Sequence, residues 1–155
     1  MQRADADFGL ISGGGIRDSI EPGQITYKDV LRVQPFGNTL GYVQMRGDEV
    51  LDYLGHVATK PTDSGAYAQF YNLSLRLKNG KVEAVRIGGE PLQPDRQYRF
   101  SLAGFYASGG DGYPRLLDHP GYVDTGFVDA EVLRAYLEQH SPINAADFAP
   151  AGEIE

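Results

Sequence analysis

The Asn79-Gly80 dipeptide is the strongest constraint that this sequence places on its own fold. It separates two segments, 72–78 and 81–87, in which apolar and polar residues alternate. Asn-Gly favours a type I′ turn, because both central residues of that turn need a positive φ. The sequence therefore predicts a β-hairpin over 72–87, and with it a fold that contains antiparallel sheet.

The other regular segments follow one another without a β-α repeat. Strand patterns cover residues 8–12, 40–46 and 98–102. Helix patterns cover residues 27–33, with Thr26 as N-cap, 47–58, with a stripe of Val50, Leu51, Leu54 and Val57, and 128–139. Loops are predicted over 60–69, 88–95 and 107–114. This irregular order favours a single α+β domain with mixed β-sheets covered by helices, a layered α/β arrangement, over a doubly wound parallel sheet.

Composition limits what the chain can bind. Its 155 residues carry a net charge of −7, which argues against binding a nucleic-acid polymer. The absence of cysteine excludes disulfides, thiolate catalysis and cysteine-based zinc sites. No stretch reaches the roughly 18 apolar residues of a transmembrane segment, and residues 1–10 lack the pattern of a signal peptide. We therefore expect any export signal to lie outside this chain.

The histidines and serines form no catalytic pattern. His56, His119 and His140 are scattered, without a second histidine or carboxylate at a spacing typical of zinc or two-metal sites. They are interpreted as surface or partly buried imidazoles. No serine lies in a Gly-x-Ser-x-Gly motif. We expect neither a catalytic residue nor a metal ligand in this chain.

Residues 12–18, Ser-Gly-Gly-Gly-Ile-Arg-Asp, place three glycines beside Arg17. Backbone N–H groups and a guanidinium could face a polar ligand there. The segment matches neither the P-loop nor the dinucleotide-binding pattern. From the motif alone, a tight turn in which Arg17 pairs with a neighbouring carboxylate is an equal interpretation.

Two further loops carry an aromatic ring beside glycine. Phe36 follows a proline and precedes a glycine, and Phe105 precedes a glycine-rich stretch that contains Asp111. Exposed rings could stack on a base, although burial preference favours a ring folded back into the core. Asp111 could accept both hydroxyls of a ribose, or it could hold its own loop in an Asx turn.

Four motifs occur in a defined order: Gly-Gly-Gly-Ile-Arg-Asp, Pro-Phe-Gly-Asn, Asp-Ser-Gly-Ala-Tyr and Gly-Gly-Asp-Gly-Tyr-Pro. Together they resemble the C-terminal domain of the 5′-nucleotidase family, most closely its bacterial periplasmic 5′-nucleotidase/UDP-sugar hydrolase branch. The resemblance covers residues 6–153. It implies a substrate-binding domain whose N-terminal metallophosphoesterase partner, with two divalent metal ions, is absent from this chain. For the parent protein it implies a periplasmic phosphoric-ester hydrolase, and for this chain alone no activity and no cofactor.

The resemblance also implies which residues bind substrate. Phe36 and Phe105 would sandwich the base, and Asn38 would approach it. Six residues in all are implied: Arg17, Phe36, Asn38, Gly65, Phe105 and Asp111.

The remaining three residues would serve other parts of the ligand. Arg17 would contact the ribose region or the phosphates, Asp111 would bind the ribose hydroxyls, and Gly65 would line the site. The expected ligands are nucleoside 5′-monophosphates or UDP-sugars.

Alternative functions remain open from the sequence. The chain could be the substrate domain of a related enzyme, such as a 2′,3′-cyclic-nucleotide phosphodiesterase or a thiosulfate-oxidation enzyme. It could also be a non-catalytic interaction domain whose loops only shape the fold. That last alternative predicts buried rings and a salt-bridged Arg17.

Overall fold

The computed structural model describes residues 5–147 and 154. Its strands are β1 (Phe8–Ser12), β2 (Thr39–Arg46), β3 (Ala68–Tyr71), β4 (Leu73–Lys78), β5 (Lys81–Ile87), β6 (Glu90–Pro91), β7 (Gln97–Ala103) and β8 (Tyr122–Val128). Its α-helices are α1 (Tyr27–Val33), α2 (Gly47–Val57), α3 (Gly104–Ala107) and α4 (Asp129–His140). Short 3-10 turns are η2 (Gly13–Gly15), η3 (Gly110–Gly112) and η4 (Ala145–Asp147).

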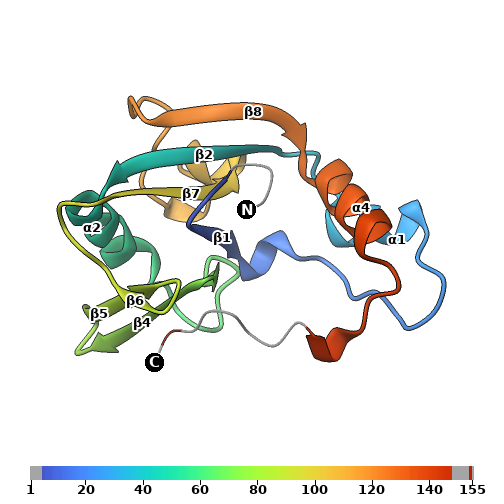
Figure 1. Ribbon diagram of the computed structural model, residues 1–155, viewed down its shortest axis with the longest axis horizontal. Helices are drawn as coiled ribbons and strands as arrows, with labels where there is room; N and C mark the ends of the chain where they lie inside the picture. Colours follow the sequence, from blue (N-terminus) through green and yellow to red (C-terminus); the bar gives the residue numbers. More distant parts are fainter. Residues whose placement is uncertain (1–4, 148–153, 155) are drawn as a thin grey trace.

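Two sheets form the framework (Figure 1). The larger has the strand order β3-β1-β7-β2-β8, and the smaller has the order β4-β5-β6. In the larger sheet β1 runs parallel to β7, whereas the other neighbouring strands are antiparallel. The predicted α+β domain with mixed sheets is therefore confirmed. The predicted end of the domain, Glu153, lies outside the described residues.

Helix α2 fills the core between the two sheets. It contacts β2 and β7 of the larger sheet and β5 of the smaller one. Val50, Leu54 and Val57 are fully buried, as predicted. The predicted burial of Leu51 is wrong: its side chain is 39% exposed, and Tyr53 is buried instead. The inward face of a helix repeats at i, i+3, i+4 and i+7, so it passes through position 53 rather than 51.

The hairpin predicted from Asn79-Gly80 is confirmed. The φ angles of these residues are 53° and 72°, both positive as a type I′ turn requires. Lys78 pairs with Lys81 across the turn. The apolar face of β4 and β5 packs into the same core as α2.

Strands β3, β6 and β8 were not predicted. Residues 60–69 were interpreted as a loop, yet β3 begins at Ala68, and β6 lies within the predicted turn region 88–95. Strand β8 lies at an edge of the larger sheet and is mostly exposed, with no buried residue. An exposed edge strand needs no alternating apolar residues, so it leaves little hydrophobic pattern to read.

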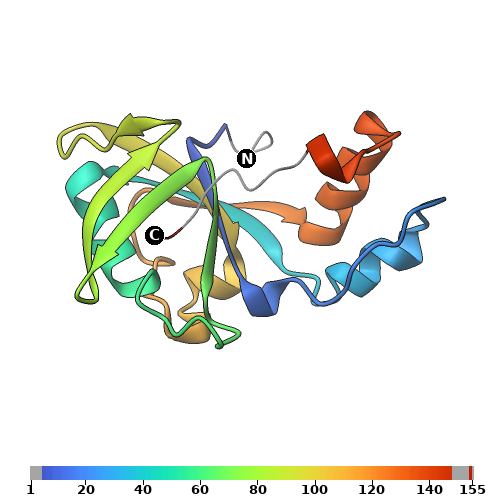
Figure 2. The ribbon, with the colours of Figure 1, turned by 90° about the horizontal axis from the view of Figure 1, so that it is seen from below.

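Helices α1 and α4 lie together at one end of the molecule, with the smaller sheet at the opposite end (Figure 2). Thr26 caps α1 as predicted, and its hydrogen bonds with Asp29 form a capping box that lowers the pKa of the Asp29 carboxyl. The Tyr27 hydroxyl donates to Glu131 of α4 at 2.5 Å. Among the described residues, no helix is long and apolar enough to cross a membrane.

Candidate functional site

One cleft of about 630 Å³ brings together loops that are far apart in the sequence. It opens beside the end of β1, and the loops after α1, before β3 and after β7 complete its wall. All six residues implied by the resemblance line it: Arg17, Phe36, Asn38, Gly65, Phe105 and Asp111.

The two phenylalanine rings of the cleft are exposed. Phe36 is 58% exposed and Phe105 is 45% exposed. The ring of Phe105 meets Tyr106 edge-on, with 5.3 Å between ring centroids, and covers Gly110, where a Cβ atom would lie 2.5 Å from it. The alternative that Phe36 folds back into the core is therefore wrong.

Arg17 has no ion-pair partner within the part of the chain that the structure describes. Its neighbour Asp18 pairs instead with Arg32 at 2.5 Å. The guanidinium of Arg17 donates to the carbonyl of Gly14 at 3.3 Å and lies 5.9 Å from the Phe36 ring centroid. The salt-bridged interpretation of Arg17 is wrong, and the cation remains available to a ligand.

The glycine run after β1 holds a neighbouring loop. Gly14 N–H donates to the Gly65 carbonyl at 2.7 Å, and Gly13 N–H donates to the Tyr67 carbonyl at 2.9 Å. A Cβ atom on Gly14 would lie 3.0 Å from the Gly65 carbonyl oxygen. The expectation that these N–H groups face a ligand is wrong for Gly13 and Gly14, because both are used to bring Gly65 to the cleft.

Asp111 adopts a left-handed conformation, with φ 57° and ψ 16°, between Gly109 and Gly112, which also have positive φ. Its carboxylate accepts a hydrogen bond from the Ser12 hydroxyl at 2.8 Å. Among the described residues, no backbone N–H of its own loop donates to this carboxylate, so the Asx-turn interpretation is wrong. Left-handed backbone at a residue other than glycine stores strain, and such residues cluster at functional sites.

Asn38 is half-buried at the edge of the cleft. Its carbonyl accepts the backbone N–H of Asp129, 2.9 Å away, which ties the loop after α1 to the start of α4. Within the described residues its side-chain amide makes no hydrogen bond. The amide is therefore free to donate to and accept from a ligand.

A buried hydrogen-bonded group in the wall of the cleft was not predicted from the sequence. Ser12 and Tyr106 are buried and hydrogen-bonded to each other, and the Tyr106 ring stacks on Tyr113 with 5.3 Å between centroids. The Tyr113 hydroxyl donates to the Ala66 carbonyl at 2.8 Å, and burial raises the pKa of that hydroxyl. The sequence signal for this group is its position, since Ser12, Tyr106 and Tyr113 lie within or next to the glycine-rich motifs.

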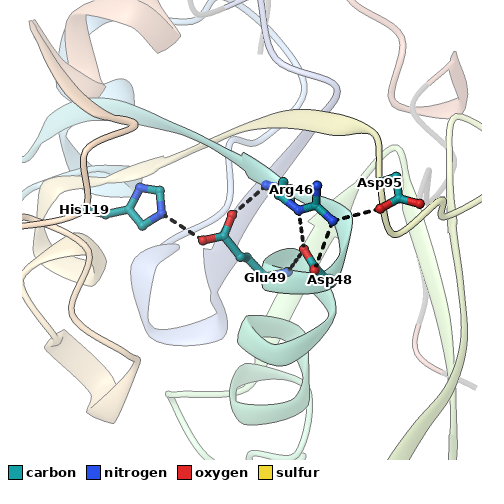
Figure 3. A network of polar contacts seen from close by, with 5 residues as sticks. All are labelled: Arg46, Asp48, Glu49, Asp95 and His119. Carbon is teal, nitrogen blue, oxygen red and sulfur yellow. Dashed lines mark hydrogen bonds and ion pairs between the residues drawn. The ribbon is translucent and has the colours of Figure 1, made fainter.

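A second cavity, of about 740 Å³, lies beside α2. Three of its lining residues, Asp48, Glu49 and His119, belong to the network of polar contacts in Figure 3. His119 Nε2 lies 3.7 Å from Glu49, and Glu49 also accepts the backbone N–H of Arg46 at 2.8 Å. The guanidinium of Arg46 contacts Asp48 at 3.2 Å and Asp95 at 2.8 Å. Because these side chains already have partners within the protein, the cleft around Arg17 is the stronger candidate site.

The histidines have the positions that were predicted. His56 and His140 are exposed, and His119 is half-buried. No group of three or more histidine, aspartate or glutamate side chains in the described part of the chain could hold a metal ion.

Comparison with known proteins agrees with this geometry. The model of the family "5′-nucleotidase, C-terminal domain" matches residues 1–118. The chain is 64% identical to a 5′-nucleotidase of Vibrio cholerae and 58% identical to protein UshA of Yersinia enterocolitica, in each case over 99% of this chain and 28% of the relative.

A solved structure gives the same result. A 5′-nucleotidase precursor from Thermus thermophilus superposes with a TM-score of 0.84 at 34% identity, covering 99% of this chain and 32% of the other. The chain thus spans about 28% of the length of the curated relatives it matches. Since the family model covers most of the sequence and the fold agrees, the chain belongs to the 5′-nucleotidase C-terminal domain family.

Proposed function

We propose that this chain is the nucleotide-recognition domain of a metal-dependent 5′-nucleotidase/UDP-sugar hydrolase, in which Phe36 and Phe105 hold the base. The observation that carries the proposal is the exposure of both rings at one cleft, beside an Arg17 that pairs with no carboxylate of the described residues. Stacking a base on an aromatic side chain contributes roughly 1–3 kcal/mol of binding free energy. Two rings would therefore supply most of the binding free energy of a weakly bound nucleotide.

The polar residues of the cleft suit the rest of a nucleotide. The Asp111 carboxylate accepts a single hydrogen bond from the part of the chain that the structure describes, and it retains acceptor positions for two ribose hydroxyls. The Arg17 guanidinium would meet the ribose region or the phosphates. The Asn38 amide would bind the edge of the base, and Gly65 lets the ligand approach the backbone closely.

Hydrolysis belongs to another part of the longer protein in this proposal. The described residues offer no metal-binding group, and the relatives are more than three times as long as this chain. Two divalent metal ions would be held by an N-terminal metallophosphoesterase domain, which would cleave the phosphate ester. We propose a periplasmic location for that longer protein.

The exposed rings favour this function over two alternatives. An interaction domain whose loops only shape the fold would bury Phe36 and Phe105, and it would pair Arg17 with a carboxylate. An enzyme that acts on a sulfur carrier has no base to stack. The substrate domain of a cyclic-nucleotide phosphodiesterase would also use such rings. The preferred ligand, rather than the fold, distinguishes that alternative from the proposed function.

Calorimetric titration with AMP and UMP tests the proposal. We expect weak binding and no release of phosphate. Phe36→Ala and Phe105→Ala should each weaken binding by about 1–3 kcal/mol. Phe127→Ala is the matched control, because Phe127 is also 45% exposed but lies on β8 and does not line the cleft. Absence of binding at millimolar nucleotide would contradict the proposal, as would an equal loss in the Phe127 variant.

A further inference from the structure

Ser12 and Tyr106 form a buried hydrogen-bonded pair directly behind Asp111. Ser12 is fully buried and Tyr106 is 3% exposed. The Tyr106 hydroxyl lies 3.1 Å from the Ser12 backbone nitrogen and 3.0 Å from the Ser12 Oγ. Ser12 Oγ in turn lies 2.8 Å from Asp111 Oδ2.

The protons available in this group determine which atom donates in each of its hydrogen bonds. An ionised carboxylate can only accept, so the single proton of the Ser12 hydroxyl points to Asp111. The Tyr106 hydroxyl must therefore donate to Ser12 Oγ, and the lone pairs of its own oxygen accept the Ser12 backbone N–H. The result is a one-way chain that starts at a backbone N–H and ends at one carboxylate oxygen.

We propose that Ser12 and Tyr106 are positioning residues that orient the Asp111 carboxylate toward the two hydroxyls of a ribose. This inference rests on the proposed function. The bond from Ser12 occupies one acceptor position on Oδ2 and limits rotation of the carboxylate, while no described residue donates to Oδ1. Hydrogen bonds to a charged group are stronger than neutral ones, especially where water is excluded.

The surrounding residues keep this pair in place. A Cβ atom on Gly15 would lie 2.4 Å from the Tyr106 hydroxyl oxygen, so only glycine lets the η2 turn pass so close. The Tyr106 ring is held by its stacking on Tyr113. The pair thus links the end of β1 to a residue whose own backbone is held in the left-handed region.

The test compares binding of AMP with binding of 2′,3′-dideoxy-AMP, which lacks both ribose hydroxyls. The wild-type chain should prefer AMP by about tenfold or more, the equivalent of one good hydrogen bond. Ser12→Ala and Tyr106→Phe should each lower the ratio of the two affinities toward one, because an unrestrained Asp111 carboxylate is no longer aligned with the ribose hydroxyls. Both variants keep the fold by retaining the packing of the side chain, and Tyr106→Phe leaves the Ser12 hydroxyl in place.

Matched controls separate positioning from general damage. Ser101→Ala, in β7 of the same sheet, and Tyr98→Phe, which removes a buried hydroxyl that accepts the Gln93 N–H at 2.9 Å, should leave the preference unchanged. A structural role alone would weaken both ligands equally. If Ser12→Ala and Tyr106→Phe retain the wild-type preference, the positioning role is overturned. If the wild type binds neither ligand, the proposed function fails and this inference fails with it.

Discussion

Gly110 determines where the ring of Phe105 can lie. A Cβ atom at position 110 would approach three atoms of that ring to between 2.5 and 2.7 Å. The backbone of Gly110 does not need a positive φ, so an alanine there strains nothing except the ring. Because the ring is exposed, it can move away at little cost to stability.

Gly110→Ala is therefore expected to lower nucleotide affinity while leaving the unfolding temperature unchanged. The loss of binding free energy should be about 1–3 kcal/mol, the contribution of one base-stacking ring. Calorimetry with AMP and a thermal melt measure the two quantities. In a Phe105→Ala background the same change should have no further effect on binding, and additive losses would contradict the account.

The residues proposed to contact a nucleotide were easier to predict than the residues that hold them in place. Phe36 and Asp111 belong to recognisable loop motifs, whereas Ser12 is an ordinary serine at the end of a strand. Its hydrogen bonds join residues 94 and 99 positions apart. Only the folded topology brings such partners together, so no local pattern could have indicated them.

At the scale of elements, the features that depend on a few neighbouring residues were predicted correctly. The hairpin at Asn79-Gly80, the Thr26 cap and the limits of β1 were found from a few residues each. Strands β3 and β8 were missed because pairing with distant strands makes them. Strand β3 has only four residues, too few for its alternation to stand out, and β8 has no buried residue. Leu51 was misplaced because it directly follows Val50, and successive residues of a helix point in different directions, so the buried face continues at Tyr53 and Leu54.

Gly80 gives a direct test of the hairpin assignment. Its φ is 72° and nothing lies within 4 Å of a Cβ atom there, so Gly80→Ala would be strained only through its backbone. We expect a loss of about 1–2 kcal/mol in the free energy of unfolding by urea, with AMP affinity unchanged. Gly55→Ala is the control, because Gly55 lies in α2 with open space around it, and alanine there should be neutral or stabilising by up to about 1 kcal/mol. Equal stability of the Gly80 variant and the wild type would contradict the assignment.

At the scale of the whole molecule, the framework and the site are separated. The core between the two sheets involves α2 and the hairpin, whereas the cleft is built from loops at the ends of β1, α1 and β7. Function on loops held by a rigid framework allows ligand contacts to vary without loss of the fold. The sequence motifs indicated residues that line the cleft, but only the folded structure shows that these residues share one cleft.

In the proposed complex, one nucleotide base lies between Phe36 and Phe105. Nuclear Overhauser effects between the base protons of bound AMP and the ring protons of both residues detect this arrangement. We expect contacts from the base to both rings in the same complex, with the ribose protons close to Asp111. Base protons that contact neither ring, or only one of them, at saturating ligand would contradict it.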